Sequence, residues 1–251
     1  AGLVASLVTA GFPGPLSGQG FNSTHSDAYL VSEVSSIRPG TPFTVAVRFE
    51  MDPGWHNYWE NAGDSGLPTT IEWTLPEGFE AGEIQWPVPG RIVAYPLVDY
   101  GYSDEVALLV EITPPADLRE TSSVTLDATV DWLICETICL PAYADLSLEI
   151  PVASGTAEAD PQWVAIFREF RNRLPSPVEG WTARAEVSEA GYRLTVEATE
   201  AGLFLPVSVY FYASGSSIID HAAPQAMSVV GSTLSLEVAG SAYALKPTPI
   251  L

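Results

Sequence analysis

Basic residues, histidines and cysteines are all scarce in this chain of 251 residues. Ten Lys and Arg stand against 31 Asp and Glu, which gives a formal net charge of -21. A protein that tracks phosphates needs a basic face, so this balance excludes nucleic acid as a partner. No run of about 18 or more apolar residues occurs, and the sequence therefore predicts no membrane-spanning helix.

Apolar residues make up 47% of the chain, which is ample for buried cores. The length suits one large domain or two medium ones. We expect three parts: a flexible amino-terminal segment over residues 1–28, rich in Gly, Pro and Ser, a first domain over 29–152, and a second domain over 153–251.

Short strand-like stretches follow one another between Tyr29 and about Val152. Alternating apolar and polar residues predict half-buried strands, and a denser apolar run predicts a buried one. Turn-forming segments with Pro and Gly separate these stretches. The predicted strands are 43–49, 106–112, 124–133 and 145–150. This spacing predicts an antiparallel β-sandwich of the immunoglobulin-like type.

The second part begins with a helix signal. Asp160-Pro161 is typical of a helix start, and apolar residues then recur at helical spacing over 162–174. Further alternating stretches predict strands at 192–197, 207–212 and 234–238. The sequence therefore predicts a mostly all-β chain with two β-sandwich-like domains, the first immunoglobulin-like, and one helix opening the second.

The two cysteines, Cys135 and Cys139, are only four positions apart. Strand-like residues precede Cys135, and a new strand begins a few residues after Cys139. We therefore expect the pair near the end of a hairpin, where two Cα atoms can come within the about 4.4–6.8 Å that a disulfide requires.

Three interpretations of this pair compete. A structural staple closing so short a loop would contribute only about 2 kcal/mol. Two thiolates suit Cu(I) or Zn(II), yet no histidine or methionine stands beside the pair in the sequence. A short, exposed disulfide is of the kind that exchanges reversibly. Exchange is favoured on the residues alone, and the other two interpretations stay open.

The sequence around the pair is acidic. Asp131 and Glu136 are near the cysteines, and no Lys, Arg or His stands between Asp127 and Leu148. Nothing local in the sequence stabilises a thiolate, so we expect both thiols to keep an ordinary or raised pKa.

Two further motifs favour structural roles. The aromatic cluster in 55–59 is typical of a sandwich core or rim, with His56 as a hydrogen-bonded structural residue. The segment 63–68 resembles the nucleophile loop of trypsin-like proteases. Its spacing to the histidines does not fit a triad, and we interpret it as a Gly-rich turn in which Asp64 bonds backbone amides.

The chain resembles the amino-terminal periplasmic domain of the DsbD family of disulfide reductases, especially the branch containing the copper-sensitivity suppressor ScsB. The resemblance covers about residues 29–152, and residues 155–251 more loosely resemble the second periplasmic segment of that branch, notably in Ile219-Asp-His-Ala-Ala-Pro-Gln225. The matching motifs are Pro53-Gly-Trp-His-Asn-Tyr-Trp59, Asn61-Ala-Gly-Asp-Ser-Gly-Leu-Pro68, Ile71-Glu-Trp-Thr-Leu-Pro-Glu-Gly-Phe79, Ile84-Gln-Trp-Pro87, Tyr100-Gly-Tyr102 and Trp132-Leu-Ile-Cys-Glu-Thr-Ile-Cys-Leu-Pro141.

This resemblance implies a periplasmic thiol–disulfide oxidoreductase that needs no cofactor. Its electrons would come from a transmembrane redox domain of the same protein or complex. They would pass to periplasmic thioredoxin-like or disulfide-isomerase-like proteins. In the family the second cysteine attacks, which implies Cys139 as nucleophile and Cys135 as resolving cysteine.

The resemblance also implies a loop that caps the cysteine pair with an aromatic residue. The matching stretch is 98–102, where Asp99 stands in the place of that aromatic residue and Tyr100 or Tyr102 would have to serve. Three residues separate the cysteines here, where the DsbD domain has five. A Cu(I)-binding module in copper tolerance and a structural β-sandwich with a passive disulfide remain the alternative functions.

Overall fold

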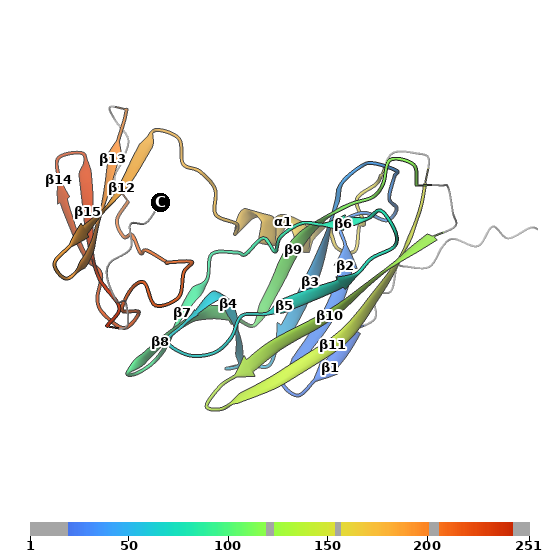
Figure 1. Ribbon diagram of the computed structural model, residues 1–251, viewed down its shortest axis with the longest axis horizontal. Coiled ribbons are helices and arrows are strands. Elements are labelled where there is room, and N and C mark those ends of the chain that lie inside the picture. Colours follow the sequence, from blue (N-terminus) through green and yellow to red (C-terminus); the bar gives the residue numbers. More distant parts are fainter. Residues whose placement is uncertain (1–19, 119–122, 154–156, 201–205, 243–251) are drawn as a thin grey trace, which may run out of the picture.

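The computed structural model describes residues 20–118, 123–153, 157–200 and 206–242. These residues form a larger first body and a smaller second body, with one helix above the first (Figure 1). Within the described residues no helix is long and apolar enough to cross a membrane. The predicted flexibility of residues 1–19 lies outside the described residues.

The first body is a sandwich of two antiparallel sheets. One sheet has the order β1-β2-β3-β9-β6 and the other β11-β10-β4-β8-β7, with β5 also paired to β10. The strands are β1 (Gly20–Ser23), β2 (Ser26–Ser32), β3 (Phe43–Met51), β4 (His56–Gly63), β5 (Thr70–Thr74), β6 (Glu80–Ala81), β7 (Gly90–Ala94), β8 (Leu97–Ser103), β9 (Glu105–Thr113), β10 (Ser123–Cys135) and β11 (Cys139–Pro151).

The alternation in the sequence explains the core between these sheets. Every second residue of β10 from Leu126 to Ile134 is buried, and β3 and β9 contribute their apolar residues from the other sheet. The predicted immunoglobulin-like sandwich is confirmed. Its sheet begins earlier than the predicted residue 29, because β1 and β2 form a hairpin over residues 20–32.

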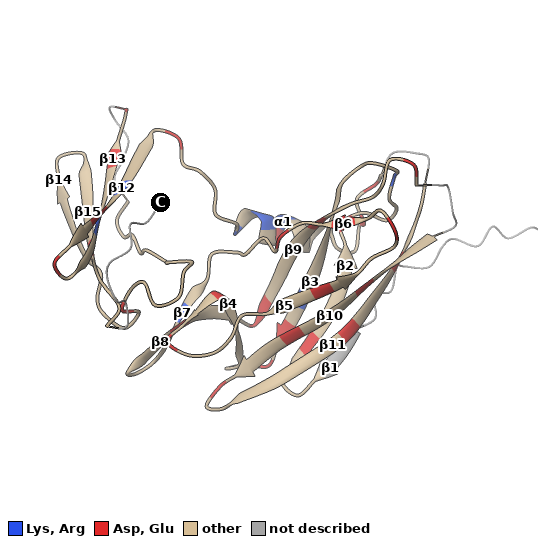
Figure 2. Ribbon diagram, viewed as in Figure 1, with Lys and Arg blue, Asp and Glu red and all other residues tan. Residues whose placement is uncertain are grey.

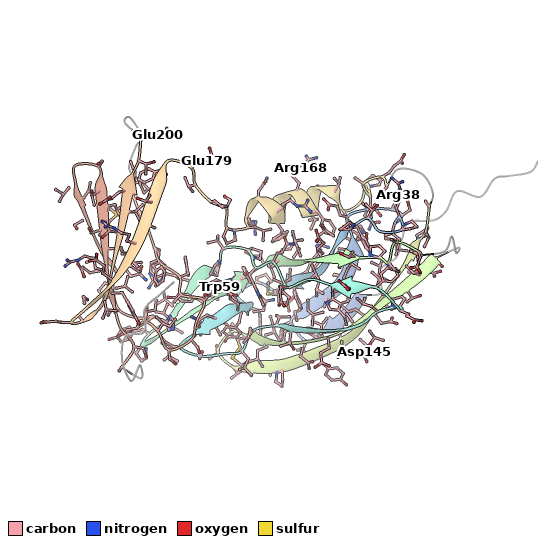
Figure 3. All side chains as sticks on the ribbon, turned by 45° about the horizontal axis from the view of Figure 1, so that its top comes forward. Arg38, Trp59, Asp145, Arg168, Glu179 and Glu200 are labelled. Atoms are coloured by element: carbon pink, nitrogen blue, oxygen red, sulfur yellow. A yellow bond between two sulfur atoms is a disulfide. The ribbon has the colours of Figure 1, made fainter. Side chains whose placement is uncertain are left out.

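The helix α1 (Val164–Asn172) packs on the first body. Phe167 and Phe170 are buried in the same apolar core as the sandwich. Arg171 adds a forked ion pair to both carboxylate oxygens of Glu33, at 2.6 and 2.8 Å. Figure 3 shows Arg168 on the outer side of this helix, turned away from the sheets. The helix stands where the sequence order predicts, but its apolar face is covered by the first body rather than the second.

The second body contains one antiparallel sheet of order β12-β13-β15-β14. Its strands are β12 (Trp181–Ser188), β13 (Gly191–Ala198), β14 (Ala226–Val230) and β15 (Thr233–Ala239). In place of a second sheet, the irregular residues 206–225 cover its buried face. Val209 and Phe211 pack there against Leu236 and its neighbours.

The predicted strand 207–212 is wrong, and the reason is physical. The side chains of this segment alternate between the two bodies. Val209 and Phe211 pack against the second body, whereas Tyr210 and Tyr212 pack against the core of the first. The side chain of Gln225 replaces a strand partner, accepting from the Phe211 amide at 2.8 Å and donating to its carbonyl at 2.9 Å.

Candidate functional site: the disulfide at the hairpin tip

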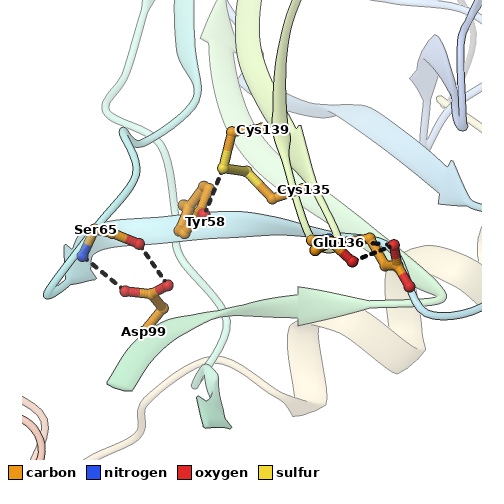
Figure 4. Close-up of a disulfide and its surroundings, with 7 residues drawn as sticks. Tyr58, Ser65, Asp99, Cys135, Glu136 and Cys139 are labelled. Atoms are coloured by element: carbon orange, nitrogen blue, oxygen red, sulfur yellow. Dashed lines mark hydrogen bonds between the residues drawn. A yellow bond between two sulfur atoms is a disulfide. The ribbon is translucent and has the colours of Figure 1, made fainter. Parts of the chain in front are cut away.

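The two cysteines close the longest hairpin of the molecule. β10 and β11 pair without a break from Ser123↔Pro151 to Cys135↔Cys139. The sulfur atoms are bonded, and the Cα atoms lie 4.1 Å apart. The predicted position of the pair at a hairpin end is confirmed, and Figure 4 shows the disulfide beside the three-residue turn that begins with Glu136.

The two cysteines differ in their exposure to solvent. Cys135 is 1% exposed and packs with Tyr58, Ala62 and Leu133 in a small cluster of its own. Cys139 is exposed. A disulfide with one open and one covered end can be attacked from outside at the open sulfur, and the covered sulfur is then the leaving group.

Tyr58 is the side chain whose hydroxyl lies against the disulfide. Its oxygen is 3.4 Å from Cys139 Sγ (Figure 4). Burial raises the pKa of this phenol, and the negative charge of Asp99 raises it further. The hydroxyl therefore keeps its proton and can donate to sulfur. The sequence predicts for Tyr58 only a place in the core or rim of the sandwich, because no local pattern shows which cross-strand neighbour a tyrosine will contact.

The Gly-rich turn holds Tyr58 in place. A Cβ atom at Gly66 would lie only 2.3 Å from the Tyr58 ring, and the φ of +85° there also favours glycine. The buried carboxylate of Asp99 accepts from the Ser65 amide and from the Ser65 hydroxyl, both at 2.7 Å. Asp64 accepts from the Val98 amide at 2.8 Å, as the turn interpretation predicted.

The three residues predicted to form the cap lie in two different places. Asp99 belongs to the turn beside Tyr58, as described above. Tyr100 is fully buried, with its hydroxyl 3.0 Å from that of Tyr210, and Tyr102 donates to the Pro87 carbonyl at 2.7 Å. Burial raises the pKa of both phenols. A cap formed by Asp99, Tyr100 or Tyr102 stays a prediction.

The strand carrying the predicted cap also contacts the second body. The Tyr100 ring meets Tyr212 and His221 with centroids 5.0 Å away in each case. Asn61, from β4, donates to the Ala213 carbonyl at 2.6 Å. The second body thus touches the two strands, β4 and β8, that support the disulfide cluster.

A histidine lies next to the pair in space although none stands near it in sequence. Among the described residues, β10 pairs with β4 at one position, which joins Cys135 to His56, and His56 in turn faces Ser103 on β8. Directly opposed residues of antiparallel strands project to the same side of the sheet. Cys139, Cys135, His56 and Ser103 therefore form one row across four strands.

The strands that lead to the disulfide carry acidic residues on their surfaces. Asp131 is exposed on β10, and Figure 2 shows further acidic positions along β5, β10 and β11. The Glu136 carboxylate accepts from the Thr137 amide and hydroxyl at 3.2 and 2.9 Å. Among the described residues no group of three or more His, Cys, Asp or Glu is arranged to hold a metal ion.

An immunoglobulin-like sandwich with a disulfide of this kind at a hairpin tip defines a module for thiol–disulfide exchange. Residues 27–151 match the family described as thiol:disulfide interchange protein DsbD, N-terminal, so this part of the chain belongs to the family of DsbD amino-terminal domains. This confirms the resemblance found in the sequence.

A solved structure agrees over both bodies. The N-terminal periplasmic domain of ScsB from Proteus mirabilis is similar with a TM-score of 0.64 at 16% sequence identity, over 92% of this chain and 87% of that chain. At this identity the likeness concerns the fold. The comparison with curated proteins found no match.

Proposed function

We propose that this chain is a periplasmic electron carrier that takes two electrons from a membrane redox domain and reduces disulfides in periplasmic partner proteins. The observation that carries the proposal is the asymmetry of the pair, with Cys139 exposed and Cys135 buried. The family match supports thiol–disulfide exchange, and the similar solved structure, described as a periplasmic domain, supports the compartment.

The electron transfer to the partner takes place in two exchange reactions. The Cys139 thiolate attacks a partner disulfide, a mixed disulfide forms, and one partner sulfur leaves as a thiolate. Cys135 then attacks Cys139 Sγ, which restores the Cys135–Cys139 bond and releases the second partner sulfur. The partner gains two electrons and two protons, and a dithiol of the membrane domain later returns the pair to its reduced form.

The surface beside Cys139 supports contact with another protein. Ile138 and Tyr143 on the hairpin, and Leu67 on the Gly-rich turn, are 63%, 66% and 64% exposed. A hollow next to them is lined by Leu67, Leu133 and Pro141 and is largely apolar. Exposed apolar side chains gathered in one place are typical of protein interaction sites.

Single-cysteine variants test the roles of the two sulfurs. With Cys135→Ala, the exposed Cys139 is expected to form a stable mixed disulfide with an oxidised thioredoxin-fold protein. With Cys139→Ala, the buried Cys135 is expected to react about tenfold or more slowly. The double variant is the control, and the adducts are quantified by mass spectrometry of unreduced samples.

Each other outcome has a definite meaning. Trapping only with Cys139→Ala would reverse the assignment of nucleophile and resolving cysteine. Trapping with neither variant, under conditions in which a small disulfide reagent reacts, would leave the bond as a passive staple and would end the proposal.

A further inference from the structure

Cys135 is chemically isolated in the mechanism proposed above. Its sulfur is buried, so water and hydroxide have little access to a proton on it. Burial in apolar surroundings raises the pKa of a thiol, and a thiol attacks only as its thiolate. The resolving step therefore needs a base next to this sulfur.

His56 is the base that the sheet places there. It is the register partner of Cys135 across β10 and β4, so the two side chains project from adjacent strands to the same side. Cβ atoms of such partners lie about 4.5–5.5 Å apart, a separation that an imidazole can bridge to a sulfur. Tyr58, two residues further along β4, faces the same side, which agrees with its contact to Cys139.

The surroundings of His56 keep it ready to accept a proton. It is 7% exposed, and burial lowers the pKa of its imidazole, partly offset by the negative charge of Asp99. The Tyr58 ring meets it edge to face at 5.3 Å, and Ser103 faces it from β8. The groups around it are therefore the Asp99 carboxylate, the Tyr58 phenol and, as register partners on the two adjacent strands, Cys135 and Ser103.

One ring nitrogen of His56 is also available for a hydrogen bond. Its Nε2 atom is buried and, among the described residues, has no hydrogen-bond partner in this disulfide form. A buried polar atom without a partner is costly, and in a native protein it calls for a reason. The reason offered by the geometry is a partner that exists in the other redox state only, since Cys135 carries a proton only after the disulfide is reduced.

We propose that His56 is the proton acceptor of Cys135 in the resolving step, an inference that rests on the function proposed above. In the mixed disulfide, the Cys135 thiol gives its proton to His56 as the sulfur attacks Cys139 Sγ. The Cys135–Cys139 bond forms, the bond from Cys139 to the partner breaks, and the partner leaves as a thiolate. The imidazolium then returns its proton to solvent or to that thiolate.

The reverse direction uses the same proton. When a thiolate of the membrane domain attacks Cys139, Cys135 leaves with the electron pair of the disulfide. A protonated His56 neutralises this buried charge at the moment it appears. Tyr58 serves the exposed sulfur and His56 the buried one, so each sulfur has its own hydrogen-bonding side chain.

The test measures the reactions of the two sulfurs as two separate kinetic phases. The reduced chain reacts with an aromatic disulfide reagent that releases a coloured thiolate: the first equivalent reports attack by Cys139, and the second reports resolution by Cys135. In His56→Phe, the second phase is expected to slow on the order of 100-fold at pH 7, the scale of general-base catalysis. The loss should shrink as pH rises, because hydroxide then ionises the thiol directly.

Controls assign each result. His25→Phe, at a half-buried position on another part of the molecule where His25 stacks on Trp55, should leave both phases unchanged. A slowing of the second phase by one factor at every pH would mean a packing role and would overturn the inference. If the unmodified chain shows no second phase at all, the proposed function fails and not the role of His56.

A measurement on the unmodified chain covers the case in which His56→Phe does not fold. Proton titration of His56 by NMR in the oxidised and in the reduced chain should give different imidazole pKa values, because the group couples to the Cys135 thiol only after reduction. The same pKa in both redox forms would contradict the proposal.

Discussion

Gly66 determines where Tyr58 can lie, so the site is sensitive to substitution at this residue. Gly66→Ala brings a Cβ to within 2.3 Å of the Tyr58 ring, in addition to the strain of a φ of +85°. Gly231 has φ +62° and no atom within 4 Å of such a Cβ, so Gly231→Ala carries the backbone strain alone. We expect Gly231→Ala to cost about 1–2 kcal/mol of unfolding free energy, and Gly66→Ala about 1–3 kcal/mol more.

Urea denaturation of both variants measures this difference. Gly66→Ala should also change the reactivity of the disulfide, because Tyr58 must move away from Cys139. Equal destabilisation by the two substitutions would show that the Gly66 contact does not hold Tyr58.

Tyr58→Phe removes the hydroxyl that contacts Cys139 Sγ while keeping the ring. A net hydrogen bond of about 1 kcal/mol to the thiolate corresponds to about 0.7 pH unit, so the pKa of Cys139 should rise by roughly that amount. The rate of alkylation against pH, in a Cys135→Ala background, gives this pKa. Tyr143→Phe, on an exposed residue of the same hairpin, should leave it unchanged; a rise in both would remove Tyr58 from the site.

At this scale the sequence predicts only part of the site. Cys135 and Cys139 are four positions apart, so their partnership follows from local spacing. His56 and Tyr58 lie about 80 positions away and reach the disulfide through the register of β4 against β10. Nothing in one sequence fixes that register, and the sequence therefore predicts only structural roles for both residues.

At the scale of elements, the helix α1 decides where the boundary between the two domains lies. We propose that the first domain extends through the helix, since Phe167 and Phe170 belong to its core. Phe167→Ala should destabilise the unfolding transition of the sandwich by about 3–5 kcal/mol. Val178→Ala, on a residue that is 67% exposed, is the control and should stay within about 0.5 kcal/mol of the unmodified chain.

Tryptophan fluorescence of the first body follows this transition in both variants. If Phe167→Ala instead weakens only a separate transition of the second body, the helix belongs there, as the sequence order predicted.

The elements predicted from the sequence differ in how well their pattern determined their structure. Strands such as β3 and β10 alternate because one face is buried in a sheet, whereas β9 is a dense apolar run buried on both faces; in these strands the pattern was sufficient. The segment 207–212 alternates equally well, yet its two faces contact two different bodies. A period of two predicts an extended chain, and only the tertiary structure decides whether that chain has strand partners.

At the scale of the whole molecule, the contact between the two bodies makes the stability depend on pH. His221 is buried against Tyr100, and burial lowers the pKa of its imidazole. The unfolded chain therefore binds a proton that the folded chain does not, once the pH falls below the ordinary histidine pKa of 6.5. Stability is complete above that pH and decreases as the pH falls toward the lowered pKa, by at most about 1.4 kcal/mol per pH unit for one proton.

His221→Phe should remove this part of the pH dependence. Denaturation between pH 7 and pH 5 should then show a smaller loss of stability in the variant than in the unmodified chain. The ion pair of Glu33 with Arg171 lowers the pKa of that carboxyl below 4.5, so its contribution is lost at more acidic pH and does not enter this window. Parallel curves for the two chains would exclude a proton-linked role for His221.

At the scale of the molecule, the account rests on a disulfide that opens and closes in the folded protein. Equilibrating the full chain with a graded series of dithiol and disulfide buffers, and measuring the fraction of the Cys135–Cys139 bond by mass spectrometry, gives its midpoint potential. Exchange predicts a midpoint above about -300 mV, together with rapid equilibration. A midpoint far below that value, with a bond that resists every dithiol offered, would contradict the account.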